Sequence, residues 1–218
     1  MTSDGARVFL VLPTSRPSYS ETGKCSIGWY ARRALRVADD LSPASGADVF
    51  LYGDPASDRY EEGGAAVRTR VDPVSFDEWA ADWAVAPNAG LGPLEDRRPA
   101  SRLEQALEVG VSSFSRPRTA LRQVVPTLRE GSAPALVIFR LDSAIDQEEI
   151  LRTIRDTGVE RLAFWHLFGW SHAIDVPFWT KDGLDRGRVL PNVSVNTGGG
   201  WSHRSLLRRF SRWSASPV

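Results

Sequence analysis

VFLVLPTSRPSYS, from Val8 to Ser20, changes at Pro13 from an apolar run to a loop of proline, serine, threonine and arginine. A short continuous apolar run is typical of a β-strand that is covered on both faces. In an open parallel sheet, ligands bind in the crevice outside the carboxyl ends of the strands. The loop that begins at Pro13 is therefore the first candidate for a functional surface.

The composition indicates one globular domain that spans residues 1–218. Hydrophobic residues make up 42% of the chain, which is enough for a substantial core. The 27 acidic and 27 basic residues balance, so the overall charge gives no sign of a nucleic-acid partner. Cys25 is the one cysteine, which excludes an internal disulfide and suits a reducing compartment. The sequence contains no segment apolar enough to span a bilayer, so we expect no membrane partner and a cytoplasmic location.

Hydrophobic periodicity predicts strands and helices that alternate along the chain. The expected strands are Arg7–Leu12, Ala47–Tyr52, Ala66–Val71, Ala135–Leu141, Arg161–Phe168 and Val189–Val195. The expected helices are Ile27–Leu41, Phe76–Val85 with Ser75 as its cap, Ser101–Leu107, Thr119–Leu128, Gln147–Asp156 and Ser202–Trp213. We therefore expect an α/β fold, a Rossmann-like three-layer α/β/α sandwich whose mostly parallel open sheet carries an antiparallel edge strand at Ala66–Val71.

Several stretches taken in order carry a further signal: VFLVLPTSRPSYS before a long helix, ADVFLYGD, GVSSFS, and PALVIFRLDSA followed by a helix and RLAFWHLFGW. In this order they resemble the von Willebrand factor A (vWA) family, and within it the bacterial tellurite-resistance type. The closing LLRRFSRW is similar to the final helix of those relatives. The resemblance covers nearly the whole chain and implies a single vWA-like domain.

That family builds a metal-ion-dependent adhesion site (MIDAS) from three loops at the carboxyl end of its sheet. By resemblance, the Asp and two Ser positions of the first loop fall at Pro13, Ser15 and Pro17, the Thr of a later loop at Ser112, and the last Asp at Asp142. Mg²⁺ needs hard oxygen ligands, and proline supplies neither a carboxylate nor a hydroxyl. The resemblance thus implies a degenerate adhesion site with remnant positions at Ser15, Ser112 and Asp142. We expect no cofactor, with weak Mg²⁺ binding at most.

Three uses of these loops stay open from the sequence. Ser15 and Ser112 could satisfy backbone groups in tight turns, while Asp142 caps a turn or pairs with Arg16 or Arg140. A carboxylate from elsewhere, for which Asp54 and Asp146 are the candidates, could restore a metal site. The loops could also form a metal-independent surface for a protein partner, and we assign that loop face to Ser15, Arg16, Ser112, Ser113 and Asp142.

Aromatic residues suggest a second contact surface. Eight tryptophans occur in the chain, and part of that set must lie in the core. If Trp170, Phe178 and Trp179 lie on an exposed loop, they form an aromatic anchor, because such residues dominate interface energetics.

Two other patterns carry weaker signals. His166 and His172 lie close in sequence, but zinc needs three or four ligands, so we expect structural histidines. The glycine-rich stretch Asn196–Ser205 precedes a helix and could hold a phosphate, although it lacks the residues of a Walker loop. A simple connection is the favoured interpretation of that stretch.

These observations favour a non-enzymatic protein–protein interaction or scaffold domain of a bacterial stress-resistance or conflict system. The resemblance implies an AAA-type ATPase or another component of a vWA system as the partner. The competing hypothesis is a nucleotide- or phosphate-binding enzyme or sensor that uses the crevice at the carboxyl ends of the strands. A third is a structural subunit of a larger assembly.

Overall fold

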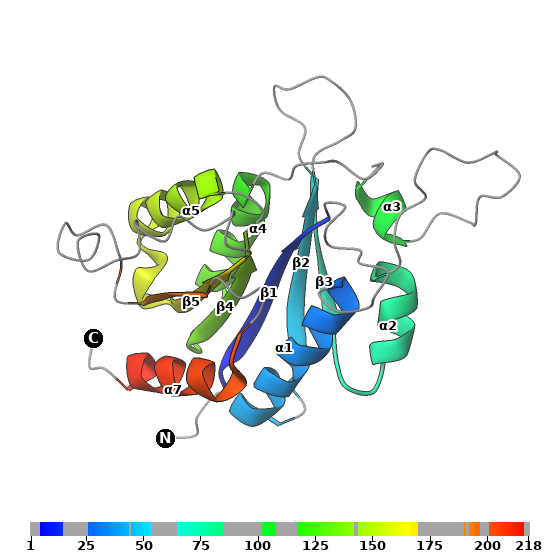
Figure 1. The fold of residues 1–218 in the computed structure, drawn as a ribbon, viewed down its shortest axis with the longest axis horizontal. Coiled ribbons are helices and arrows are strands. Elements are labelled where there is room, and N and C mark those ends of the chain that lie inside the picture. Colours follow the sequence, from blue (N-terminus) through cyan, green and yellow to red (C-terminus); the bar gives the residue numbers. More distant parts are fainter. Residues whose placement is uncertain are drawn as a thin grey trace, which may run out of the picture.

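The computed structural model describes residues 5–14, 26–43, 45–53, 65–84, 102–107, 117–141, 144–169, 190, 192–196 and 201–215. Among these residues the chain forms a six-stranded sheet in the order β3-β2-β1-β4-β5-β6 (Figure 1). The strands are β1 Arg7–Pro13, β2 Ala47–Gly53, β3 Ala65–Val71, β4 Ala135–Arg140, β5 Ala163–Phe168 and β6 Val193–Asn196. Strand β3 is antiparallel to β2, and every other neighbouring pair is parallel. The mixed α/β class and the antiparallel edge strand are confirmed.

Helices connect these strands. They are α1 Ile27–Leu41, α2 Phe76–Trp83, α3 Arg102–Leu107, α4 Pro117–Arg129, α5 Ala144–Thr157 and α7 His203–Ser214. Helix α1 has the predicted bounds because both ends carry local signals: the Ser26 hydroxyl accepts a hydrogen bond from the Trp29 backbone N–H at 3.2 Å, and the Ser42 N–H closes the last turn on the Ala38 carbonyl at 2.7 Å. Gly158 follows α5 with a φ of 66°, the left-handed conformation that glycine adopts at low cost.

Several predicted bounds differ from the structure, with shifts of one to three residues at the ends of α2, α4 and α5 among them, and three differences have a clear local cause. Strand β6 starts at Val193 instead of Val189, because the Val193 N–H donates to the Leu190 carbonyl at 3.0 Å and closes a turn there. Arg161 belongs to a short 3₁₀ helix, so β5 begins at Ala163. Ser75 precedes α2 but makes no side-chain capping bond, because its hydroxyl donates to the Asp72 carboxylate at 2.7 Å.

The sheet is covered on both faces, which explains the apolar runs of its central strands. Along β1, Val8, Leu10 and Leu12 belong to one buried cluster, whereas Phe9 and Val11 belong to another. The first cluster includes residues of α1, α2 and α7, and the second includes residues of α4 and α5. Figure 1 shows these helices beside the strands that they cover. The two clusters fix the strands, and the strand ends in turn fix the position of the candidate site.

Within the described part of the chain, every helix falls short of the length and apolar character needed to cross a membrane.

Candidate functional site

The candidate site lies where the carboxyl ends of the parallel strands meet, which we call the carboxyl edge. Strands β1 and β4 are neighbours, yet the chain leaves β1 toward β2 on one side, while β5 and β6 follow β4 on the other. This divergence is a topological switch point, the usual place for a ligand crevice in an open α/β sheet. Of the predicted loop face, Ser15 and Arg16 follow β1 in sequence and Asp142 follows β4, whereas Ser112 and Ser113 lie between α3 and α4.

The residues predicted for the two contact surfaces fall outside the described residues. For the loop face these are Ser15, Arg16, Ser112, Ser113 and Asp142, and for the aromatic anchor they are Trp170, Phe178 and Trp179. The same holds for His172, for Asp54 and for the side chain of Asp146. The described part of the carboxyl edge is therefore the base from which these loops leave the sheet.

Hydrogen bonds tie the strand ends together at this base. Thr14 bonds to the Tyr52 carbonyl twice, through its N–H at 2.8 Å and its hydroxyl at 3.1 Å. The Tyr52 hydroxyl donates to the Arg140 carbonyl at 3.3 Å, and the Leu141 N–H donates to the Phe168 carbonyl at 2.8 Å. The ends of β1, β2, β4 and β5 are thus held in one connected set, which makes a fixed platform for the loops.

Arg140 is the charged residue buried beneath the carboxyl edge. It is the last residue of β4, it is 1% exposed, and its guanidinium carbon lies 5.4 Å from the centre of the Tyr30 ring. An arginine keeps its proton in proteins, so a permanent positive charge lies below the switch point. A guanidinium over an aromatic face gains a cation–π attraction, which is larger when the cation is desolvated.

The Tyr30 ring belongs to an aromatic cluster that fills the space between α1, β5 and α7. It lies 5.0 Å from the Phe168 ring and 5.9 Å from the Trp201 ring, with which it is stacked. Arg33 lies 4.9 Å above the same Trp201 and donates a hydrogen bond to its carbonyl. Arg140, Tyr30, Phe168, Trp201 and Arg33 together form what we call the arginine–aromatic cluster.

Sequence reasoning named Arg140 only as a partner for Asp142 and missed this cluster. The available signal was the charged residue inside the run ALVIFRL, since a charge that interrupts an apolar strand must be compensated where it is buried. The glycine-rich stretch ends in the cluster as well: Trp201 is 4% exposed and packed in the core, while residues 197–200 lie outside the described residues. The favoured interpretation of that stretch as a connection, and the alternative of a phosphate site, both concern residues outside the described part of the chain.

His166 is buried among structural contacts. It is 6% exposed, and its Nδ1 lies 2.8 Å from the Ser194 hydroxyl of β6. Burial, together with the charge of Arg209, lowers the pKa of His166 to about 3, so its ring is neutral at physiological pH. His203, at the start of α7, pairs instead with Asp40 of α1 at 2.5 Å. Among the described residues, no three His, Cys, Asp or Glu side chains lie together as metal ligands would.

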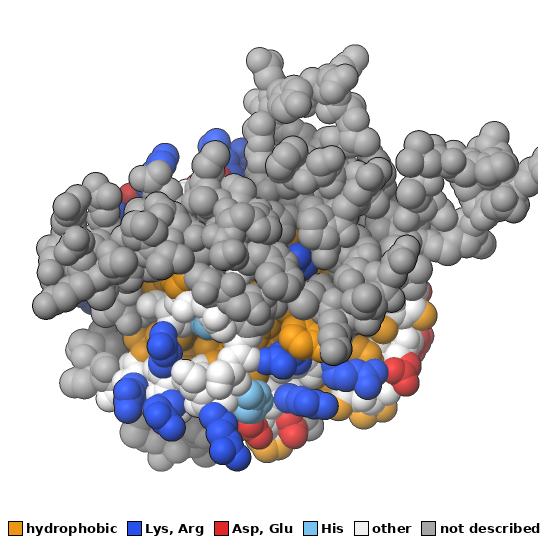
Figure 2. Space-filling model, viewed as in Figure 1, with side chains coloured by type: hydrophobic (Ala, Val, Ile, Leu, Met, Phe, Trp, Pro, Cys, Tyr) orange, Lys and Arg blue, Asp and Glu red, His pale blue; other side chains and the backbone are white. Residues whose placement is uncertain are grey.

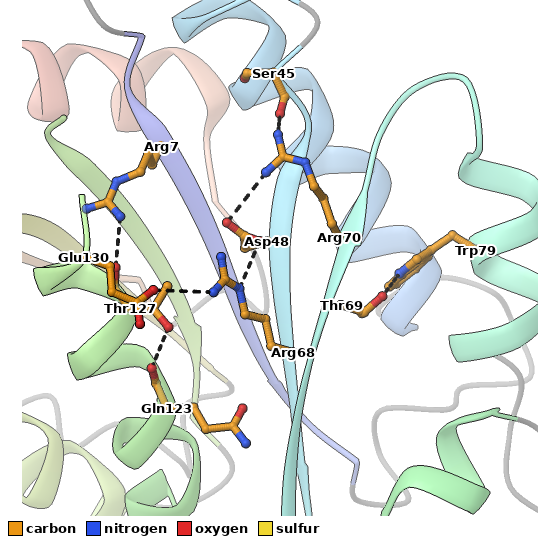
Figure 3. A network of polar contacts seen from close by, with 10 residues as sticks. All are labelled: Arg7, Ser45, Asp48, Arg68, Thr69, Arg70, Trp79, Gln123, Thr127 and Glu130. Atoms are coloured by element: carbon orange, nitrogen blue, oxygen red, sulfur yellow. Dashed lines mark hydrogen bonds and ion pairs between the residues drawn. The ribbon is translucent and has the colours of Figure 1, made fainter. Parts of the chain in front are cut away.

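The opposite end of the sheet, the amino end, holds a network of paired charges (Figure 3). Asp48 of β2 lies 3.2 Å from Arg68 and 3.7 Å from Arg70, both on β3, and Arg68 also lies 3.9 Å from Glu130. These pairs hold the edge strand to its neighbour and place charge on an edge that would otherwise invite pairing with another chain. Their arrangement is structural.

Arg7 joins this network from β1. Its guanidinium donates to the Thr127 carbonyl at 3.0 Å, to the Leu128 carbonyl at 2.9 Å and to the Gly131 carbonyl at 3.4 Å, all at the end of α4. The last carbonyls of a helix have no intrahelical partner, and a positive charge near them interacts favourably with the negative end of the helix dipole. Burial is the main cause that lowers the pKa of Arg7, and the nearby Asp48 opposes it.

Comparison with known proteins gives no family. No protein-family model matches the chain, and a search of curated proteins also finds no match. Solved structures that match include proximal thread matrix protein 1 from the mussel byssus, in two crystal structures with TM-scores of 0.41 and 0.38 at 11% identity, and the pilus adhesin SpaC from Lactobacillus rhamnosus GG, with a TM-score of 0.43 at 10% identity. Each match covers 97% of this chain, but only 47% of the mussel protein and 30% of the adhesin. The chain thus spans less than half the length of these proteins.

Proposed function

We propose that this chain is a vWA-like protein-interaction domain that binds its partner through the carboxyl edge of the sheet without a metal ion. The strand order supports the proposal, because it places β1 and β4 side by side at a switch point and β3 as an antiparallel edge. Helices packed on both faces support a three-layer α/β/α arrangement around that sheet.

The chemistry at the ends of β1 and β4 is the observation that carries the proposal. Strand β1 ends at Pro13, which has no carboxylate to hold a divalent cation. The neighbouring strand β4 ends at Arg140, a buried residue whose side chain is a hydrogen-bond donor and not a metal ligand. The site therefore favours acidic groups of a partner over a metal.

The partner is a protein of the same system, either an AAA-type ATPase or another vWA-type component of a bacterial stress-resistance or conflict pathway. The loop face of Ser15, Arg16, Ser112, Ser113 and Asp142 supplies the contact. Its arginine would pair with a carboxylate of the partner, with two parallel hydrogen bonds. The aromatic residues Trp170, Phe178 and Trp179 would add a second anchor. The domain acts in the cytoplasm.

Site-specific photo-crosslinking tests this proposal. A benzoylphenylalanine replaces Ser113 in one variant and Val74 in the other, so that Arg16 stays in place, and both are irradiated in cells and in lysate with a chelator present. Val74 is a matched control, because it is 98% exposed and follows β3 at the amino end of the sheet. We expect one protein to be crosslinked from position 113 but not from position 74, with the same yield in the chelator. Equal crosslinking from both positions, or a product that requires Mg²⁺, would contradict the proposal.

A further inference from the structure

A cavity of about 900 Å³ opens at the amino end of the sheet, away from the carboxyl edge. It lies between the second half of α7, the start of β5 and the turn that leads into β6. Its lining includes Arg161, Phe164, Asn192, Arg209, Arg212 and Trp213. Its volume is within the range of about 300 to 1,000 Å³ that is usual for small-molecule sites.

Asn192 lines this cavity and carries an unsatisfied hydrogen-bond acceptor. The residue is 1% exposed, its backbone carbonyl accepts from the Trp165 N–H at 2.7 Å, and its side-chain amide nitrogen donates to the Ala163 carbonyl at 2.9 Å. The amide bond to Ala163 orients the side chain, whose Oδ1 is buried and accepts no hydrogen bond. A buried acceptor without a partner costs about 1–3 kcal/mol, so a ligand whose donor reaches Oδ1 would recover that cost.

Cations surround the same opening. Arg209 and Arg212 lie one turn apart on α7, and Arg161 faces them from the 3₁₀ helix before β5. Helix α7 contains no acidic residue, and Glu160 is the acidic side chain among the described residues that line the cavity. Figure 2 shows arginine side chains gathered over α7 on this face of the molecule. The positive charge of arginine at such an opening suits a phosphate, which guanidinium groups bind with two parallel hydrogen bonds.

An aromatic wall completes the cavity. Trp213 is partly exposed and is held in place by Phe164, whose ring lies 6.2 Å away, and by Phe210, whose ring lies 5.7 Å away. A nucleobase packs on such an indole with a contribution of about 1–3 kcal/mol. The cavity therefore combines an acceptor, an aromatic surface and a pair of cations on one helix.

We propose that this cavity binds a nucleoside monophosphate whose base carries an exocyclic amine. The amine donates to Asn192 Oδ1, the base packs against Trp213, and the phosphate is held by Arg209 and Arg212. This small-molecule site is separate from the protein-binding carboxyl edge and does not depend on it. Occupancy would tie the end of α7 to the sheet and so could report a nucleotide level to the rest of the domain.

Calorimetry with four probes tests the chemistry from the ligand side. The probes are AMP, adenosine, inorganic phosphate and purine riboside 5′-monophosphate, which lacks the amine. We expect AMP to bind at least about ten times more tightly than each of the other three, a difference of about 1.4 kcal/mol or more. Equal affinity of AMP and the amine-free compound would overturn the role of Asn192, and no heat with any probe would overturn the site.

Paired variants test the same site from the protein side. Arg209→Gln with Arg212→Gln removes two charges from the cavity, whereas Arg204→Gln with Arg208→Gln removes two exposed charges from the same helix outside it. We expect the first pair to weaken AMP binding at least about tenfold and the second to change it less than about twofold. Equal losses in both pairs would show only a general attraction of anions to α7 and would overturn the proposal.

Discussion

Each end of the sheet holds an arginine, partly buried at the amino end and fully buried at the carboxyl end, and the contacts of the two differ. At the amino end, Arg7 of β1 donates to three carbonyls at the end of α4, so its guanidinium joins a strand to a helix. At the carboxyl end, Arg140 of the neighbouring strand β4 lies over the ring of Tyr30, directly beneath the start of the predicted functional loops. The comparison shows that one arginine joins a strand to the end of a helix through hydrogen bonds, whereas the other lies in an aromatic cluster at the end of β4.

Replacing Arg140 should have the largest effect on stability. Arg140→Ala removes a fully buried cation from the arginine–aromatic cluster and leaves a space beside Tyr30. We expect the free energy of unfolding to fall by about 2–5 kcal/mol, as when other large buried side chains are truncated to alanine. Urea denaturation measures this fall. A loss below about 1 kcal/mol would mean that Arg140 contributes little to the stability of the arginine–aromatic cluster, and would remove the contrast between the two ends.

Replacing Arg7 should cost less, because Arg7 is only partly buried. Arg7→Met keeps much of the side-chain volume but leaves the carbonyls of Thr127, Leu128 and Gly131 without their donor. We expect a loss of about 2 kcal/mol in the free energy of unfolding. The matched control is Arg152→Met, which changes an exposed arginine of α5. If both variants lose the same amount, the guanidinium of Arg7 does not stabilise the end of α4.

His166 should make stability depend on pH. Its pKa is about 3 in the folded protein, mainly because of burial, and about 6.5 when exposed, so below pH 6.5 the unfolded chain binds a proton that the folded chain does not. The contribution of the neutral ring is therefore complete above pH 6.5 and is lost as the pH falls toward 3, with a slope of up to about 1.4 kcal/mol per pH unit.

Urea denaturation from pH 7.5 to 4 checks the effect of His166. The difference in slope between the wild-type protein and His166→Phe isolates this one group, whatever the absolute stability of the variant. Parallel curves for the two proteins would contradict the burial of a neutral imidazole against Ser194.

Asp72 should give the smallest effect, at an exposed turn of the amino end. Its carboxylate accepts from the Val74 and Ser75 N–H groups, both at 2.9 Å, and from the Ser75 hydroxyl, which is the main cause that lowers the pKa of Asp72. Asp72→Asn should lower the melting temperature slightly at pH 7, and less at a pH below the pKa of this carboxyl, where the wild-type group is also neutral. Glu78→Gln on α2 is the control for a lost surface charge, and an equal shift there would argue against the turn.

The central part of the fold could be predicted from the sequence because its signals are local. The apolar runs of β1 and β4 and the capped periodicity of Ile27–Leu41 determine these elements with little help from distant residues. Strand β6 was predicted too long at its start, because the turn at Leu190 is closed by a backbone hydrogen bond that the residue types in this segment do not indicate.

The long-range contacts were harder to predict. The hydrogen bonds of Arg7 join residues 120 or more positions apart. The unsatisfied acceptor of Asn192 can be recognised only once β5 and β6 are placed side by side. The spacing of residues along the sequence does not indicate such contacts. Arg140 was visible as a charge in an apolar strand, but its place over Tyr30 depends on how α1 packs on the sheet.

The most direct test of a metal-independent carboxyl edge is a calorimetric titration of the purified protein with Mg²⁺ and Mn²⁺, repeated on Asp142→Ala. If the strand ends at Pro13 and Arg140 supply no ligand for a divalent cation, neither protein should give binding heat or thermal stabilisation. Micromolar binding in the wild-type protein that disappears in Asp142→Ala would contradict this account and would show a working metal site with a substitute ligand.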